Sequence, residues 1–175
     1  MTIKKFFKLQ VFALLFAAII SPLSALAGTD SKLATIKFVL GTNEVTVGKT
    51  GCGPSYYGGN ITGIGIGKMT VDEKHTNLGV LSLAADDCIT PMVNYFTAKG
   101  SLTLTTGTGD TIKANYSVSF IPTNVALIYK YENFTLQITG GTGIFTGATG
   151  SGIVEGVSNI QTGLGVVDGT MSISK

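Results

Sequence analysis

The sequence predicts an all-β protein: a single antiparallel β-barrel of about eight or nine strands, with a β-sandwich as the alternative. Apolar and polar residues alternate along most of the chain, and the apolar positions are rich in β-branched and aromatic side chains. Glycine, of which there are 24 copies, separates these runs together with Asn, Asp and Thr. No segment shows the 3.6-residue apolar stripe of an amphipathic helix.

The alternation places the individual strands. In chain order, the expected strands cover Leu33–Leu40, Glu44–Val47, Ile61–Val71, Leu78–Ala84, Tyr95–Thr105, Ile112–Phe120, Phe134–Ile138, a pair marked by Ile144-Phe145 and Ile153-Val154, and Val166–Ile173. The turn Gly107–Asp110 predicts the most distinct hairpin, because the strand after it alternates without interruption. Within Ile61–Val71, glycines share one face, which lets another backbone or a bulky side chain approach closely.

Two features favour the barrel over the sandwich. The strands are rich in Thr and carry few charges, so an open edge would invite pairing with another chain, and closure removes the edges. The glycine face of Ile61–Val71 also suits the strong curvature of a barrel wall.

The first 27 residues predict a secretory signal peptide. Lys4, Lys5 and Lys8 form a positive region before the apolar run Val11–Ile20, and Ala25-Leu26-Ala27 follows as a cleavage site. The run is only about half of the roughly 20 residues that a membrane-spanning helix needs, which favours a signal over an anchor. We therefore expect residues 28–175 to form one secreted or periplasmic domain without a membrane span.

The charged residues exclude some classes of function. The chain has 12 basic residues, all of them Lys, against 10 acidic residues and one His, and removal of the signal would leave nine Lys against ten acids. Such a protein lacks the basic, Arg-rich surface of a nucleic-acid binder. One His and two Cys cannot build a zinc cage, so we expect no metal and no cofactor.

Cys52 and Cys88 predict a single disulfide, because an exported chain folds in an oxidising compartment. A free reactive thiol or half of a metal site are the alternatives, and neither has a nearby His or a Cys-x-x-Cys pair to support it. Asp86 and Asp87, just before Cys88, are expected in a solvated loop tied by the disulfide.

The glycines of Gly141–Gly147 and Gly150–Gly152 invite comparison with nucleotide-binding loops. The spacing differs from both the dinucleotide and the phosphate-loop motifs, no Lys follows, and no helix-forming run comes after. We interpret these glycines as turn and bulge positions that require a positive φ.

Residues 138–152 resemble the signature of secreted bacterial proteins with an allene-oxide-cyclase-like, dirigent-like barrel. His75–Gly79 fits the same pattern, as does Gly100–Leu104 with the Gly109-Asp110 turn and the long strand after it. The resemblance covers roughly residues 63–175. The chain departs from the family pattern at Ile144, where the family commonly has Arg.

This resemblance implies an eight-stranded antiparallel barrel with a narrow apolar interior. Related barrels act as cyclases on fatty-acid epoxides or polyketides, or steer the coupling of phenolic radicals. Such chemistry depends on shape, apolar confinement and a few polar groups, without a strong nucleophile or a cofactor.

Glu132 and His75 are the candidate catalytic residues. If Phe134 points inward, strand alternation puts Glu132 and Lys130 on the same side, where burial would raise the pKa of the carboxyl. The alternative is that Glu132 emerges at the rim and pairs with Lys130, because a break or bulge is needed nearby. His75 is either a base paired with a neighbouring acid or part of a solvated turn.

Three functions remain open. The first is a non-enzymatic module that binds a small apolar ligand in the barrel, through Tyr116, Phe134 and Tyr131, or that associates through its surface. The second is a cofactor-independent cyclase or isomerase, and the third is a structural subunit of an extracellular assembly, with homo-oligomer formation. Ligand binding and catalysis both require an open interior of a few hundred Å3, whereas a filled interior favours the third.

Overall fold

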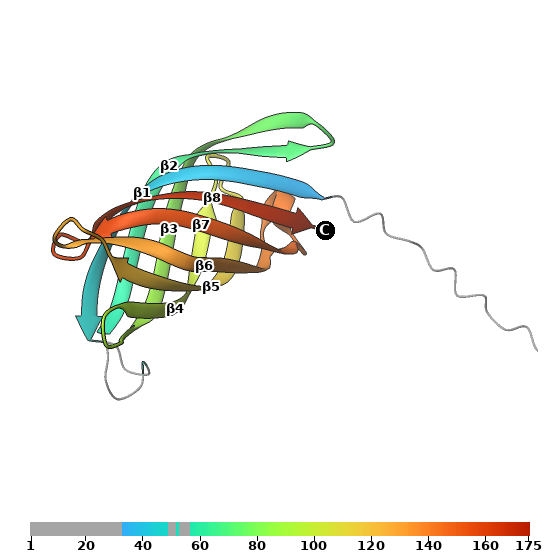
Figure 1. The fold of residues 1–175 in the computed structure, drawn as a ribbon. Coiled ribbons are helices and arrows are strands. Elements are labelled where there is room, and N and C mark those ends of the chain that lie inside the picture. The colour runs from blue at the N-terminus through green and yellow to red at the C-terminus, as the bar shows by residue number, and fades with distance from the viewer. Residues whose placement is uncertain (1–32, 49–51, 53–56) are drawn as a thin grey trace, which may run out of the picture. The chain divides into compact units, whose positions relative to one another are not determined.

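The barrel is closed and antiparallel. The computed structural model describes residues 33–48, 52 and 57–175. Eight strands follow one another around the wall in chain order, and the last pairs with the first (Figure 1). They are β1 (Ala34–Gly48), β2 (Tyr57–Val71), β3 (Lys74–Pro91), β4 (Phe96–Thr105), β5 (Thr111–Pro122), β6 (Ile128–Gly141), β7 (Thr149–Asn159) and β8 (Leu164–Ser174). The predicted barrel is confirmed, with the eight strands that the resemblance implies.

β1 is one continuous strand where the sequence predicted two. The predicted break falls at Gly41, Thr42 and Asn43, yet these residues stay in register with Ile64, Gly63 and Thr62 of β2. Two long neighbouring strands, β2 and β8, pair with this part of β1, so its turn-prone residues are held extended. The predicted strands at Leu78–Ala84 and Phe134–Ile138 are likewise parts of the longer β3 and β6.

The glycines of β2 share one face, as the alternation predicted, and this face points into the barrel. A Cβ at Gly65 would collide with the backbone and side chain of Leu40 on β1. A Cβ at Gly67 would lie 2.6 Å from Cδ1 of Leu81 on β3. The missing side chains on β2 thus make room for the interior residues of both neighbouring strands.

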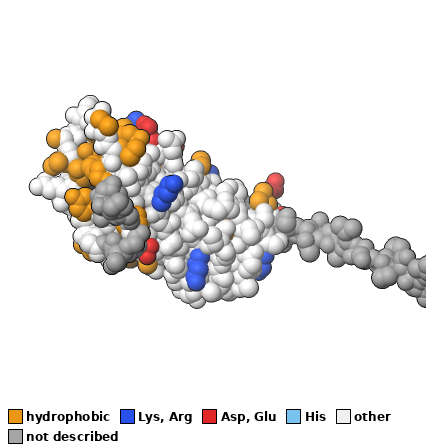
Figure 2. All heavy atoms as spheres, turned by 90° about the horizontal axis from the view of Figure 1, so that it is seen from below, with side chains coloured by type: hydrophobic (Ala, Val, Ile, Leu, Met, Phe, Trp, Pro, Cys, Tyr) orange, Lys and Arg blue, Asp and Glu red, His pale blue; other side chains and the backbone are white. Residues whose placement is uncertain are grey.

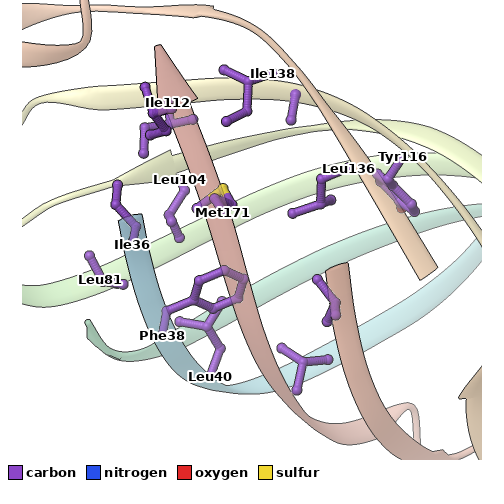
Figure 3. Close-up of a cluster of buried hydrophobic side chains, with 14 of the residues drawn as sticks. Ile36, Phe38, Leu40, Leu81, Leu104, Ile112, Tyr116, Leu136, Ile138 and Met171 are labelled. Carbon is purple, nitrogen blue, oxygen red and sulfur yellow. The ribbon is translucent and has the colours of Figure 1, made fainter. Parts of the chain in front are cut away.

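The interior is tightly filled toward the end of the barrel at which β1 begins and β8 ends, which we call the closed end. Figure 3 shows side chains from several strands meeting there. At 2% exposure or less, the fully buried large side chains are Ile36, Leu40, Leu81, Leu104, Ile112 and Met171. Phe145, in the short 3-10 helix η1 (Gly143–Phe145), is also buried and covers this end.

The strand expected at Ile144-Phe145 is wrong, because these residues belong to η1. The predicted turn role of the surrounding glycines is confirmed. Gly143 has a φ of 58° and Gly147 a φ of 75°, in the left-handed region that other residues enter only with strain. The N–H of Ala148 donates a hydrogen bond to the carbonyl oxygen of Phe145, which holds the connection over the core.

A bulge in β6 changes which side chains point inward. Asn133 has a φ of 52°, and the register between β6 and its neighbours shifts around it. As a result, both Tyr131 and Phe134 line the interior although they are three positions apart, and Glu132 lies on the outside.

The predicted disulfide between Cys52 and Cys88 is present, with the two Cα atoms 5.2 Å apart. A disulfide is consistent with an oxidising compartment. The predicted signal peptide, residues 1–27, lies outside the described residues. In the part of the chain that the structure describes, no helix has the length and apolar character needed to cross a membrane.

Candidate functional site

Polar side chains gather inside the barrel toward the end at which β1 stops and β8 starts, which we call the open end. Glu44 comes from β1, Asp87 from β3, Tyr116 from β5 and Tyr131 from β6. All four line one interior cavity, together with Thr42 and many apolar side chains. Strand alternation directs Glu44, Asp87 and Tyr116 inward, since each is in phase with core residues of its own strand, and the bulge at Asn133 turns Tyr131 inward.

Asp87 is held firmly in this group. Its side chain is only 2% exposed. Oδ2 accepts a hydrogen bond of 2.9 Å from the hydroxyl of Tyr116, and Oδ1 accepts one of 3.1 Å from the N–H of Gly59 on β2. The disulfide also holds the backbone at Asp87, because Cys88 is the next residue and Sγ of Cys52 lies 3.7 Å from the carbonyl oxygen of Asp87.

Glu44 is the less satisfied carboxyl of the two. Its backbone N–H donates to the carbonyl oxygen of Gly163 at 2.9 Å, which anchors this part of β1 to the β7–β8 connection. Its Oε1 is buried and has no hydrogen-bond partner among the described residues. Burial, and next the charge of Asp87, raise the pKa of Glu44 to about 7.

Gly59 makes the proximity of the two carboxyls possible. A Cβ at this position would lie 2.6 Å from Oε1 of Glu44 and would also collide with Oδ1 of Asp87. The two oxygens therefore lie against the same face of Gly59. Any larger residue here would have to displace one of the carboxyls.

The two tyrosines remain hydrogen-bond donors at neutral pH. Burial raises the pKa of Tyr116, and the charge of Asp87 together with the hydrogen bond to it raises that pKa further. Burial also raises the pKa of Tyr131, although hydrogen bonds with Ser158 and Thr42 act in the opposite direction. The interior therefore contains two acids and two neutral phenols.

Two cavities meet at Glu44. The interior cavity has a volume of about 60 Å3. A second cavity of about 210 Å3 lies at the mouth of the open end, and Glu44 and Phe120 line both. The mouth cavity is lined by Glu44, Thr46, Tyr57, Ile89, Phe96, Phe120, Ser158, Asn159, Ile160 and Gly163. A carboxyl thus stands where an apolar interior opens to the mouth.

Exposed apolar side chains surround this mouth. They lie on the connections and strand ends at the open end: Val45, Tyr57, Met92, Val93, Val125, Leu127, Ile160 and Leu164. Figure 2 shows hydrophobic side chains gathered at one end of the molecule, whereas white, uncharged surface covers most of the rest of this view. The entrance is therefore apolar, like most of the interior lining.

The structure brings the predicted ligand-contacting residues together. Tyr116, Tyr131 and Phe134 all line the interior cavity. The ring centroids of Tyr116 and Phe134 are 5.6 Å apart, and those of Tyr131 and Phe134 are 5.8 Å apart. Contact of these three rings with a ligand stays a prediction.

Of the two placements considered for Glu132, the structure shows the outward one, paired with Lys130. Its side chain lies on the outer surface and is 44% exposed, and its Oε1 is 2.5 Å from Nζ of Lys130. The physical reason is the bulge at Asn133, which adds one residue between Phe134 and Glu132 and reverses the alternation. A catalytic role of Glu132 stays a prediction, now for an exposed ion-paired side chain.

His75 lies on the β2–β3 hairpin, whose tip extends beyond the barrel wall (green at the top of Figure 1). It is exposed, and its Nδ1 is 2.9 Å from Oγ1 of Thr70 across the hairpin. His75 and Glu132 line separate surface grooves, and neither lines the interior cavity. The role of His75 as a base also stays a prediction.

Sequence reasoning missed Glu44 and Asp87. The expected break in β1 separated Glu44 from the inward series Ile36, Phe38 and Leu40, and Asp87 was expected in a loop. Continued alternation was the available signal: it places Glu44 in phase with Leu40 and Asp87 in phase with Leu81.

A metal centre has no support in this part of the chain. Among residues 33–48, 52 and 57–175, no three His, Cys, Asp or Glu side chains come together as metal ligands. Calcium would need six or more oxygen ligands, and the open end offers two carboxyls.

Comparison with known proteins leaves the function open. No family model matches the chain, and no curated protein matches it. The chain is similar to the solved structure of the pterocarpan synthase dirigent protein GePTS1, with 14% sequence identity, 82% of this chain and 90% of that chain covered, and a TM-score of 0.49. The function has to be argued from the residues of the site itself.

Proposed function

We propose that this protein is an exported module that binds a small, mainly apolar ligand at the open end of its barrel without transforming it. The observation that carries this proposal is the pair of cavities that meet at Glu44. Their lining is mostly apolar with a few converging polar groups, which is the usual composition of a ligand site. The apolar rim supplies an entry surface of matching chemistry.

The cavity volumes limit the size of the ligand. A dry apolar cavity of about 150 Å3 can hold benzene. The mouth cavity, at about 210 Å3, is larger than this, and the interior cavity, at about 60 Å3, is smaller. A ligand with one ring and a short substituent fits these dimensions, with the ring in the mouth and the substituent toward the interior. Space of this kind favours binding over a purely structural subunit, for which a filled interior was expected.

One polar atom defines how the ligand is oriented. A buried carboxyl oxygen without a donor costs free energy, on the order of 1–3 kcal/mol for a neutral acceptor and more for a charged one. Oε1 of Glu44 is such an atom. A ligand that donates a hydrogen bond there would recover this cost, so its donor end points inward.

Ala84 and Ala85 allow a matched test. They are neighbours on β3, but Ala85 lines the interior cavity and Ala84 is exposed on the outer face. We expect Ala85→Leu to weaken the binding of 2-phenylethanol, followed by NMR or calorimetry, at least about tenfold by filling the cavity. Ala84→Leu should leave the affinity within about twofold. Equal binding by both variants would exclude the open-end cavity as the site.

Glu44 also supports a second candidate function, a cofactor-independent isomerase. A general acid or base works best when its pKa is close to the ambient pH, and the pKa of Glu44 is raised to about 7. The hydroxyl of Tyr116 is a second proton carrier in the same cavity. This moves the candidate acid–base group from Glu132 and His75 to Glu44.

Deuterium incorporation separates catalysis from binding. The ligand that co-purifies with natively exported protein is identified by mass spectrometry and then incubated with the protein in D2O. The isomerase is supported if the wild type incorporates deuterium into the ligand and Glu44→Gln does not. Glu132→Gln and His75→Ala should then still incorporate it. A ligand recovered without deuterium would leave binding alone.

A further inference from the structure

The described residues that line the open-end cavities include two carboxyls and no basic side chain. The titratable groups that face Glu44 are Asp87 from β3, Tyr116 from β5, Tyr131 from β6 and, at the mouth, Tyr57 from β2. None of these side chains can carry a positive charge. Among the described residues, no Lys or His lines either cavity, and the sequence has no Arg.

The hydrogen bonds show which partner is missing. The two oxygens of Asp87 accept hydrogen bonds from Tyr116 and from the backbone of Gly59, whereas Oε1 of Glu44 accepts none among the described residues. A neutral hydroxyl on a ligand could supply a donor to Glu44, but it would leave the negative charge unbalanced. A protonated amine supplies the donor and the charge together, and hydrogen bonds between charged partners are the stronger ones.

Aromatic rings line the same space. Phe120 lies edge to face with Tyr131 at 5.1 Å between ring centroids, and Phe134 lies 5.8 Å from Tyr131. The faces of such rings attract cations within about 6 Å, by roughly 0.5–2 kcal/mol depending on desolvation. Rings and carboxyls together suit an organic cation that has an apolar body.

A metal ion suits the carboxyls of Glu44 and Asp87 less well than an organic ammonium group does. The described residues contain no group of three metal-ligating side chains, and much of the lining is apolar. A hard cation would keep its water in such a place, because too few oxygens replace its hydration shell. An ammonium group needs fewer partners and brings its own apolar substituent.

We infer that the ligand of the open end is a small primary amine with an apolar, one-ring body, bound through its ammonium group at Glu44 beside Asp87 while the ring occupies the mouth cavity. This inference rests on the proposed binding function and specifies its ligand class. Nothing is transformed in the binding step.

A proton leaves the site when the amine binds below neutral pH. The neutral carboxyl of Glu44 gives its proton to solvent and becomes the carboxylate that pairs with the ammonium, so the total charge is conserved. Above about pH 7 Glu44 is already ionised, and no proton is released. The affinity for an amine that stays protonated throughout therefore rises with pH up to about 7 and then levels off.

Three ligands that share one phenyl ring and a short side chain test the charge requirement. They are 2-phenylethylamine, neutral 2-phenylethanol and anionic 3-phenylpropanoate, each titrated into the natively exported protein at pH 8. We expect the amine to bind at least about tenfold more tightly than the alcohol, and the acid more weakly than both. Glu44→Gln should weaken the amine at least about tenfold and change the alcohol by no more than about twofold.

Calorimetry in buffers of different ionisation enthalpy gives an independent readout on the wild type. We expect the amine to release close to one proton at pH 6 and almost none at pH 8.5, while the alcohol releases none at either pH.

An alcohol that binds as tightly as the amine, an equal effect of Glu44→Gln on both, or an absence of proton release at pH 6 would overturn the amine assignment and leave the binding function intact. Failure of all three ligands to bind at millimolar concentration would overturn both.

Discussion

The two ends of the barrel are built from the same strands and the same alternation, yet they have different contents. At the closed end the inward positions hold Ile36, Leu81 and Ile112, all at 0% exposure and none of them lining the interior cavity. At the open end the same strands turn polar, with Glu44 following Leu40 in phase on β1. A filled layer contributes stability, while a layer with cavities and an unsatisfied carboxyl costs stability and creates a site.

The connections differ in the same way. At the closed end η1 buries Phe145 over the core, and a two-residue turn at Asp72 and Glu73 closes the β2–β3 hairpin. At the open end the connections expose apolar side chains such as Val93, at 94%, and Val125, at 58%. One end is thus covered by its own chain, and the other presents apolar groups to solvent.

The largest expected effect comes from the disulfide, which ties the open end. Replacing both Cys52 and Cys88 by Ser removes a cross-link over a sequence separation of 36, which the chain-entropy model values at about 4 kcal/mol of unfolding free energy. Denaturant unfolding measures the loss. Hydrogen exchange should quicken around Asp87 and change little at Ile112. Uniformly faster exchange would show that the two ends do not open separately.

The same truncation at the two ends measures the difference in packing. Ile112 is 0% exposed at the closed end, whereas Ile61 lines the interior cavity and is half-buried. We expect Ile112→Ala to lower the free energy of unfolding by about 3–4 kcal/mol and Ile61→Ala by about 1–2 kcal/mol, because the latter side chain already borders empty space. Equal losses in urea unfolding would mean that the open end is as tightly filled as the closed end.

Gly59→Ala tests whether the carboxyls need a gap between them. Its methyl group would meet Oε1 of Glu44 at 2.6 Å and also Oδ1 of Asp87, so we expect a loss of about 2 kcal/mol and weaker binding of 2-phenylethylamine. Gly48→Ala is the control, since no described residue lies within 4 Å of its Cβ position, and its unfolding free energy should stay within about 0.5 kcal/mol. Similar results for both variants would argue against a crowded carboxyl pair.

The pH dependence contributed by Glu44 is a separate expected effect, which appears only when stability is compared between two pH values. Burial raises its pKa from 4.5 to about 7, so between these values the folded protein keeps a proton that the unfolded chain has lost. Stability therefore falls as the pH rises through this window, and the loss is complete above about pH 7. Glu44→Gln does not titrate, so its free energy of unfolding relative to the wild type should be about 3 kcal/mol higher at pH 8 than at pH 4.

The exposed carboxyl Glu132, paired with Lys130, provides the control for this profile. Glu132→Gln should change the unfolding free energy by less than about 0.5 kcal/mol at either pH, because surface ion pairs contribute little. A profile for Glu44→Gln that runs parallel to the wild type would show that Glu44 is solvated like Glu132.

Much of the fold could be predicted because its signals are local. The alternation in β5 from Ile112 to Phe120 and the shared, closely approached face of the β2 glycines needed only the pleat of a strand, and both are as predicted. The continuity of β1 through Gly41 could not be predicted, because it depends on pairing with β2 and β8, which are distant in the sequence.

The site was harder to predict than the fold. A single bulge at Asn133 moved Glu132 to the outside and left Tyr131 inside, and nothing local indicated at which residue the bulge would occur. Tyr116, Tyr131 and Phe134 were identified because aromatic rings on alternating strands belong in the interior. The hydrogen bond between Tyr116 and Asp87 was not predicted, because the two residues are 29 positions apart in the sequence and lie on strands that are separated by β4.

By itself the sequence determined the all-β class, the antiparallel barrel, the paired cysteines and the turn role of the glycines around Phe145, because pleat, backbone freedom and thiol chemistry act over a few residues or through residue type alone. Tertiary structure decided that Glu44 and Asp87 share the space over Gly59, that Glu132 faces solvent, and that one end is filled while the other is open. These outcomes depend on register and on bulges, which are set by pairing between distant strands.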